Sequence, residues 1–391
     1  MASWQVAGGF IMETRMLLNQ RVKDLVCRVE QAADPVVFDT RVRALVSELR
    51  AACAEPRAVK RYAAARRAPG MIGSYPTDAE GYAVAFDPLT DEESFFECWL
   101  RFGIVAGKRV IAPDACSAAR ARIGEALHVL SGGSFDSARP ETWNAVPVDA
   151  AGVPVLSRGF FELYHDDMLA QLRQAVRVYV HHVVLWGRCD LWTSFDRVGV
   201  KLPSHAESRA LPLHVDQNPL VHPEFHTVQG VLALTDCQTE HGTFAGIPGS
   251  KRYFSEYARM AQGRGEYVEL AGSDRVAAAL AVHAQALPLR AGDLISWDSR
   301  TTHANTANTS NQIRMVAYIA AGPARPCNAR ALAARRRAFT TGTGWNAREA
   351  LMHASKPPRF ADAAAFARVR RAESLTLLGK LLYGQASWQR I

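Results

Sequence analysis

The sequence predicts an α+β protein with a mainly β core, an antiparallel barrel or double-sheet jelly roll, flanked by N- and C-terminal helices. Residues 191–320 contain short runs rich in β-branched and aromatic residues, which alternate with clusters of Gly, Pro, Asn and Asp. This pattern is typical of short strands joined by turns. The segments on either side instead carry apolar residues at helical spacing.

Residues 1–90 are expected to form a helical N-terminal extension. Two runs have apolar residues at helical spacing, and the second follows Pro35. The apolar positions are Leu17, Leu18, Val22, Leu25, Val26 and Val29 in the first run and Val42, Leu45, Val46 and Leu49 in the second. Pro69-Gly70 ends the helical pattern, and an irregular connection is expected from there to about residue 90.

Residues 91–325 are expected to form the core with its supporting helices. A helix followed by a strand is predicted in FFECWLRFGIVAGKRVI, and a further helix after Pro113-Asp114. The segment from Phe160 to Leu185 has the pattern of one long amphipathic helix. The strands are expected within WTSFDRVGVKL, HTVQGVLALTD, GTFAGIP, LISWD and RMVAYIAA.

Residues 326–391 are expected to form a basic, helical C-terminal extension. From Arg325 to the end the chain has thirteen lysines and arginines but three acidic residues, against a net charge of +8 for the whole chain. Such a segment binds a nucleic acid, an anionic membrane or an acidic substrate, or is simply a solvated helical face. An anionic-ligand surface would be tested first at Arg66, Arg67, Arg335, Arg336 and Arg337.

The composition restricts the protein class. No apolar run approaches the roughly 20 residues that cross a bilayer, and the N-terminus lacks the basic and apolar regions of a secretory leader. The seven cysteines are odd in number and include no CxxC pair. They predict reduced thiols and a cytoplasmic location, and argue against a disulfide framework.

The segment LPLHVDQNP carries a candidate for metal chemistry. In a strand, residues two apart point to the same face, so His214 and Asp216 can converge on one ion. An imidazole and a carboxylate suit a divalent metal, and one more histidine completes the face that holds iron(II) with open positions. Taken alone, His-x-Asp is more often a hydrogen-bonded surface pair.

A second block, GDLISWDSRTTHANTANTSNQIRMVAYIAA, supplies the missing groups. His303 follows a predicted buried strand, and Arg314 opens the next apolar strand. A guanidinium offers two parallel N–H donors to a carboxylate, such as the far end of a dicarboxylate cosubstrate. The alternative for Arg314 is a structural salt bridge at the strand edge.

Three ordered blocks between about residues 94 and 320 resemble the phytanoyl-CoA dioxygenase family of iron(II)- and 2-oxoglutarate-dependent oxygenases. They are FFECWLRFGIVAGKRVIAPDACSAARARI, VQGVLALTDCQTEHGTFAGIPGSKR and GDLISWDSRTTHANTANTSNQIRMVAYI. The resemblance implies a double-stranded β-helix, which agrees with the jelly roll expected above. It also implies that Fe(II), 2-oxoglutarate and O2 serve the reaction.

By this resemblance His214, Asp216 and His303 are the catalytic metal ligands, and Arg314 binds the distal carboxylate of 2-oxoglutarate. Cosubstrate contacts are also expected from residues on the flanking strands and beside the distal histidine: Lys201, Gln229 and Asn305. The chain departs from the family at Asn305, where a small hydroxyl residue is common, and at Lys251, where histidine is frequent. Halogenating relatives have a small residue at the position of Asp216, so its presence favours hydroxylation or a related oxidation.

The sequence leaves three functions open. The first is a hydroxylase of a small organic molecule, neutral or anionic, that releases succinate and CO2. The second is an oxygenase acting on a nucleic acid or another polyanion, although the basic tail lacks the interleaved aromatic residues of a single-strand stacking platform. The third is a catalytically silent β-barrel binding module.

Overall fold

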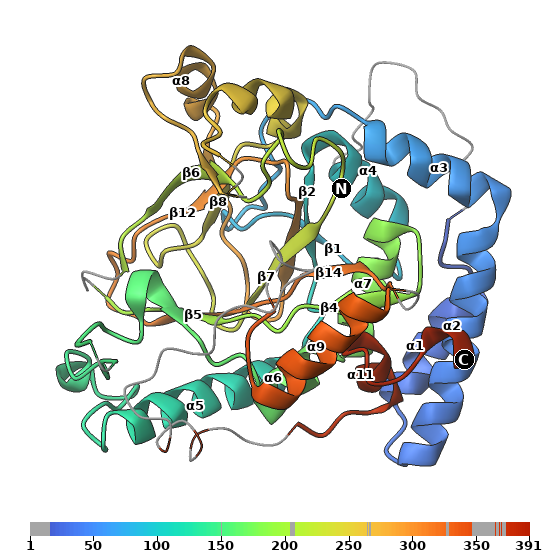
Figure 1. Cartoon of the computed structure of the whole chain (residues 1–391), viewed down its shortest axis with the longest axis horizontal. Coiled ribbons are helices and arrows are strands. Elements are labelled where there is room, and N and C mark those ends of the chain that lie inside the picture. Colours follow the sequence, from blue (N-terminus) through green and yellow to red (C-terminus); the bar gives the residue numbers. More distant parts are fainter. Residues whose placement is uncertain are drawn as a thin grey trace.

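The computed structural model describes residues 16–149, 151–203, 208–263, 265, 267–325, 328–345, 364, 367, 369 and 373–391. Two sheets, antiparallel except where β1 joins β2, face each other as a double-stranded β-helix (Figure 1), which confirms the predicted jelly roll. The expected lack of a secretory leader concerns the N-terminus, of which residues 1–15 lie outside the described part.

The larger sheet runs in the order β1-β2-β11-β7-β13-β5-β3, with β14 joined to β7 and β4 joined to β14. Its strands are β1 (Ala85–Phe86), β2 (Ile104–Gly107), β3 (Phe160–Phe161), β4 (Leu191–Thr193), β5 (Val198–Lys201), β7 (Val228–Ala233), β11 (Leu294–Asp298), β13 (Arg314–Tyr318) and β14 (Ala321–Pro323). The smaller sheet runs β10-β8-β12-β6-β9. Its strands are β6 (Leu211–Val215), β8 (Phe244–Gly246), β9 (Val268–Glu269), β10 (Gln285–Ala286) and β12 (His303–Asn305).

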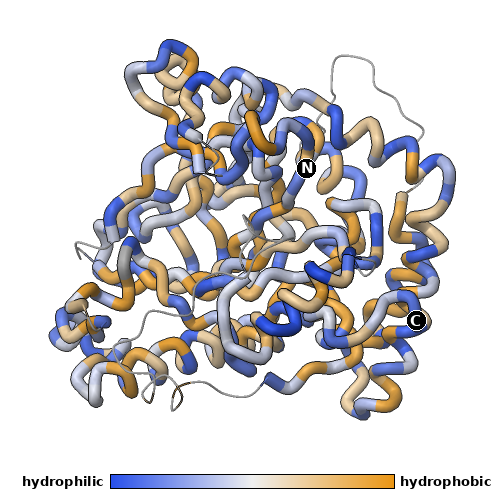
Figure 2. The backbone as a smooth tube through the Cα atoms, viewed as in Figure 1, coloured by the Kyte–Doolittle hydropathy of each residue, from blue (hydrophilic) through white to orange (hydrophobic). Residues whose placement is uncertain are grey.

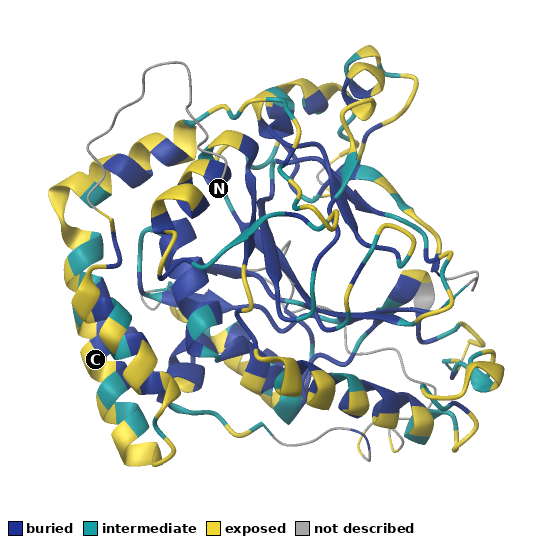
Figure 3. Ribbon diagram, turned by 180° about the vertical axis from the view of Figure 1, so that it is seen from behind, coloured by how far each residue is buried: buried dark blue, intermediate teal, exposed yellow. Residues whose placement is uncertain are grey.

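The central strands of the larger sheet are buried along their whole length, as Figure 3 shows. Their outward residues pack against helices: Leu232 of β7 and Ala317 of β13 lie in one apolar cluster with Ile123 of α5 (Pro113–Leu130) and Val178 of α7 (Val176–Trp186). Their inward residues face the space between the sheets. Burial on both faces explains why these strands are mostly apolar, apart from residues such as Gln229 and Arg314 that face the space between the sheets.

The N-terminal helices follow the predicted pattern. They are α1 (Gln20–Glu30), α2 (Pro35–Ala54) and α3 (Pro56–Arg67), followed after the irregular connection by α4 (Glu92–Phe102). The Asn19 and Asp34 side chains accept hydrogen bonds from the free amides of the first turns of α1 and α2. Hydrophobic and hydrophilic residues alternate along these helices (Figure 2), and the apolar stripe predicted for α2 is fully buried.

The prediction of one long helix from Phe160 to Leu185 is wrong. The segment forms β3, then α6 (Asp167–Arg173), then α7. Asp166 starts α6 as its N-cap, accepting from the Met168 amide at 3.1 Å. Ala175 is extended (φ −58°, ψ 132°) and separates the two helices. Apolar periodicity runs through both helices, so it does not report the break between them.

The described part of the C-terminal extension is helical, as predicted, in α9 (Ala329–Thr341) and α11 (Leu377–Leu382). Arg335, expected as a candidate for an anionic-ligand surface, is instead fully buried. Its guanidinium donates to the carbonyl oxygens of Thr193, Leu382 and Tyr383, and its central carbon lies 4.2 Å from the centroid of the Phe195 ring. Arg335 therefore joins α9 to α11 and β4.

One apolar cluster runs through all three parts of the chain, from Leu45 in α2 through Trp186 in α7 to Leu381 in α11. The division into residues 1–90, 91–325 and 326–391 stays a prediction about the chain, because the extensions share this core. Within the described ranges, no helix has both the length and the apolar character needed to cross a membrane.

Replacing Arg122 with methionine is expected to lower the free energy of unfolding by about 3–5 kcal/mol, because a buried carboxylate would lose its partner. Arg122 donates to the fully buried Asp166 at 2.7 and 3.0 Å. The control Arg21→Met breaks the exposed pair with Glu48 (3.1 Å) and is expected to cost less than about 1 kcal/mol. Urea unfolding of both variants gives the comparison, and equal losses would contradict the prediction.

Candidate metal centre

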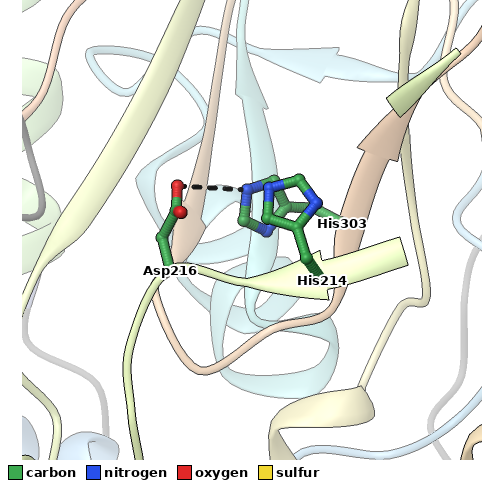
Figure 4. A group of neighbouring side chains, drawn as sticks. All are labelled: His214, Asp216 and His303. Atoms are coloured by element: carbon green, nitrogen blue, oxygen red, sulfur yellow. Dashed lines mark ion pairs between the residues drawn. The ribbon is translucent and has the colours of Figure 1, made fainter. Parts of the chain in front are cut away.

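The predicted metal ligands come together on two neighbouring strands of the smaller sheet (Figure 4). His214 lies in β6, Asp216 directly follows that strand, and His303 begins β12, where it pairs in register with His214. One ligand atom from each residue lies within 4.8 Å of the other two. The i, i+2 spacing explains why His214 and Asp216 share a face, while strand pairing brings His303 to them.

Hydrogen bonds to backbone carbonyls orient both imidazoles. The Nδ1–H of His214 donates to the carbonyl oxygen of Pro212 (2.7 Å), and that of His303 donates to the carbonyl oxygen of Thr301 (3.1 Å). A proton held on Nδ1 leaves the Nε2 lone pair for a metal. The His303 Nε2 lies 3.7 Å from Oδ2 of Asp216, so the donor atoms face one another. This donor set fits a divalent ion held at one face.

Aromatic rings enclose the histidines. The Trp297 ring centroid lies 4.9 Å from that of His303, and the Tyr267 centroid lies 4.8 Å from that of His214. Phe244 stacks on His303 from 6.2 Å. An apolar wall of this kind fixes the rings and limits water around a metal.

Gln229, predicted to contact the cosubstrate, is placed by the structure beside the carboxylate ligand. Its side chain is buried, and its Nε2 donates to Oδ2 of Asp216 at 2.9 Å. Gln229 lies in β7 of the larger sheet, so this bond joins the two sheets at the metal centre. Its Oε1 is buried without a partner in the described structure. A cosubstrate contact of Gln229 stays a prediction.

Gln229→Met is expected to weaken iron(II) binding by roughly 10- to 100-fold, as is usual when a hydrogen bond that orients a ligand is removed. The Asp216 carboxylate would lose its fixed orientation while the three ligands remain. Anaerobic iron titration measures the effect. The exposed Gln171 in α6 provides the control Gln171→Met. Iron affinity equal in the two variants would show that Gln229 does not orient Asp216.

Arg314 begins β13 and lines the cavity that contains the three metal ligands. Its side chain is 2% exposed, and its Nε has no hydrogen-bond partner in the described structure. No carboxylate of the described residues forms an ion pair with it, so the structural salt bridge considered as an alternative is absent there. Its guanidinium contacts the Cys237 thiol, whose pKa is raised by burial. A buried cation without a carboxylate fits a site that receives one.

Lys201 and Asn305, both predicted cosubstrate contacts, are bonded to each other. The Lys201 Nζ donates to Oδ1 of Asn305 and to the carbonyl oxygens of Arg209 (2.8 Å) and Thr306 (2.5 Å). Burial, together with the neighbouring Arg314, lowers the pKa of Lys201 to about 7. The Leu211 amide also donates to Oδ1 of Asn305 at 3.3 Å. The amide NH2 of Asn305 is therefore left for the cavity that this residue lines, whereas Lys201 uses its donors within the protein.

The cavity between the sheets has a volume of about 650 Å³ including its open mouth. Besides the metal ligands, Gln229, Asn305 and Arg314, its walls include residues that the sequence did not single out: Phe160, Asp196, Arg197, Phe244, Trp297 and Tyr318. These residues come from β3, β8, β11, β13 and the β4–β5 connection, and no common motif or spacing marks them in the sequence.

The geometry is that of the nonheme iron(II) oxygenases that use 2-oxoglutarate. More than half of the chain, residues 99–316, matches the phytanoyl-CoA dioxygenase (PhyH) family, and the chain belongs to this family. The predicted family, enzyme class and cofactors are thereby confirmed: the protein is an iron(II)- and 2-oxoglutarate-dependent oxygenase with the facial triad His214, Asp216 and His303.

Individual relatives are distant. The chain is 27% identical to the Ava biosynthesis cluster protein O of Aspergillus versicolor over 226 residues, covering 52% of this chain and 70% of that protein. Among solved structures, a putative oxidoreductase from Salmonella typhimurium LT2 aligns with a TM-score of 0.53 and 16% identity over 93% of this chain and 96% of its own. The epimerase SnoN, solved with Fe3+, alpha ketoglutarate and nogalamycin RO, aligns with a TM-score of 0.43 and 21% identity over 68% of this chain and 96% of its own.

Proposed function

We propose that this oxygenase hydroxylates a small organic molecule and converts 2-oxoglutarate to succinate and CO2. The observation that carries the proposal is the buried Arg314, without a carboxylate partner among the described residues, in the cavity that contains the three metal ligands. The relative from Aspergillus versicolor is named for a biosynthesis cluster, which supports a small-molecule substrate.

The residues of the cavity have separate roles in the proposed reaction. His214, Asp216 and His303 hold iron(II), and Gln229 orients the Asp216 carboxylate. Arg314 pairs with the distal carboxylate of 2-oxoglutarate, and the Asn305 NH2 donates to the cosubstrate beside it. Iron(II) with 2-oxoglutarate and O2 supplies the oxidising power that places oxygen on a C–H bond. Trp297 and Phe244 keep water away from the centre.

The intact carboxylate at Asp216 favours oxygen insertion, since the carboxylate occupies the place that a halide would need. The buried Arg335 does not favour a polyanion as the substrate, because a cation that is bonded inside the protein contributes no accessible charge. We also propose that residues 1–90 and 326–391 are extensions that support the oxygenase core of residues 91–325.

Succinate formation without added substrate is the direct test. The purified protein, loaded anaerobically with iron(II) and then exposed to O2, should convert 2-oxoglutarate to succinate slowly and stop when the iron is chelated. Small molecules that accelerate this turnover are candidate substrates, and mass spectrometry should detect the added oxygen atom. Iron binding without any succinate would instead support a silent binding module.

A further inference from the structure

We propose that Arg197, held by Asp196 and Phe160, binds the substrate of this oxygenase and selects molecules that carry a carboxylate group. The inference rests on the proposed function and adds a substrate class to it. Arg197, Asp196 and Phe160 all line the cavity that contains the metal ligands, and the reaction described above gives none of them a role.

The guanidinium of Arg197 is held on two sides. Its Nε donates to Oδ1 of Asp196 at 3.1 Å, and the Arg197 backbone amide donates to the same oxygen at 2.8 Å. Its central carbon lies 4.2 Å from the centroid of the Phe160 ring, which is a favourable cation–π distance. Arg173 also holds the backbone at Asp196 in place, because its guanidinium donates to the carbonyl oxygen of Asp196 at 2.6 Å. The Arg197 side chain is therefore preorganised.

This arrangement leaves one edge of the Arg197 guanidinium for a ligand. Within the described residues, the two terminal nitrogens, Nη1 and Nη2, form no hydrogen bond or ion pair, and the side chain is 23% exposed. Two coplanar N–H donors in a fixed fork match the two oxygens of a carboxylate. Asp196 balances the single positive charge of Arg197, so the pair is neutral overall. A phosphate dianion would be repelled by Asp196 more strongly than a carboxylate monoanion, so the fork favours the monoanion.

The position of Arg197 separates it from the cosubstrate. At one end of β13, Arg314 lies opposite Lys201 in the antiparallel register of β13 and β5. At the other end, the backbone amide of Tyr318 donates to the carbonyl oxygen of Arg197. Four residue steps along a strand separate their backbone positions by ~13 Å, while the Arg314 guanidinium extends toward Gly199, on the β5 strand between them. A cosubstrate held between Arg314 and the metal ligands leaves the Arg197 end of the cavity for the substrate.

The surroundings of Arg197 also indicate the rest of the molecule. Phe160 and Tyr318 stand side by side in the cavity wall with ring centroids 5.5 Å apart. These rings offer an apolar surface next to the guanidinium fork. The inferred substrate is a carboxylate with an apolar body, bound so that the carboxylate lies on Arg197 and the body lies against the two rings.

The test compares acids with their own amides. Aromatic and aliphatic monocarboxylic acids, each paired with its primary amide, are screened for acceleration of 2-oxoglutarate turnover and for thermal stabilisation of the iron-loaded protein. Several acids should be effective at concentrations at least roughly 10-fold lower than their amides, since one charge-assisted bidentate contact is worth more than about 1.4 kcal/mol. If no acid surpasses its amide in either measurement, the inference is overturned.

Substitutions of Arg197 test whether this residue produces the preference for acids over amides. Arg197→Met should remove the preference for acids over amides, and Arg197→Lys should restore part of it because the charge returns without the fork. Arg139→Met, which changes an arginine with a 61% exposed side chain, should keep the full preference. A preference that persists in Arg197→Met would overturn the inference, whereas a wild-type protein that forms no succinate at all would overturn the proposed function instead.

Discussion

His303→Ala is expected to abolish stoichiometric iron(II) binding and all formation of succinate from 2-oxoglutarate. The variant loses one of the three donor atoms that lie within 4.8 Å of one another, and the remaining imidazole and carboxylate hold an ion far more weakly. Loss of a hydrogen bond that merely orients a ligand already costs roughly 10- to 100-fold in affinity, so loss of the ligand itself should cost more than ~100-fold. Anaerobic titration with iron(II) measures this directly.

The fold of the variant needs a separate check, because His303 also packs against Trp297 and Phe244. Circular dichroism and urea unfolding of the apoprotein serve this purpose. The exposed His283 gives the matched control His283→Ala, which should bind iron as the wild type does. His214→Ala should repeat the result of His303→Ala. Iron-dependent succinate formation in either ligand variant would refute the assignment of the metal centre.

Arg314→Met is expected to weaken 2-oxoglutarate binding by about 2–5 kcal/mol, a rise of roughly 30- to several-thousand-fold in Kd. The guanidinium is buried, and the described residues provide no carboxylate for it. The cosubstrate would therefore supply its partner, and a methionine of similar length would leave that distal carboxylate buried and unpaired. Equilibrium binding of 2-oxoglutarate to the metal-loaded protein, without O2, gives the Kd.

Arg314→Met has a second expected effect, which is on the stability of the apoprotein. Removal of an arginine that has no carboxylate partner should leave the apoprotein as stable as the wild type, or more stable, since the cost of burying the charge disappears. Arg314→Lys should bind 2-oxoglutarate with intermediate affinity because it keeps the charge without the fork. A large loss of stability with unchanged 2-oxoglutarate affinity would mark Arg314 as a structural residue.

Two other substitutions compare a buried arginine–carboxylate pair with an exposed one. Arg122→Met and Arg21→Met both break an arginine–carboxylate pair, but Asp166 is fully buried whereas Arg21 is exposed. Desolvation makes the unpaired Asp166 costly, whereas water replaces the lost partner of Glu48. The contrast is a property of tertiary position, since both pairs have the same chemistry.

The sequence by itself determined the metal ligands and the jelly roll, and it singled out Arg314, which the structure places in the cavity that contains these ligands. His-x-Asp in a strand places both side chains on one face because side-chain direction alternates along any strand. The runs of β-branched residues between turn residues predicted the sheets, since burial on one or both faces selects such residues. These features depend on local backbone geometry or on ordered motif blocks, so they can be read along the chain.

The tertiary structure alone decided the rest. The break between α6 and α7 is not visible in an apolar pattern that continues through both helices. The roles of Gln229, bonded to Asp216, and of Lys201, bonded to Asn305, arise where strands of different sheets meet. Arg197 faces the cavity only because the β4–β5 connection passes beside Phe160 and Tyr318. Contacts between residues distant in sequence depend on how the sheets pack, and local periodicity carries no record of that packing.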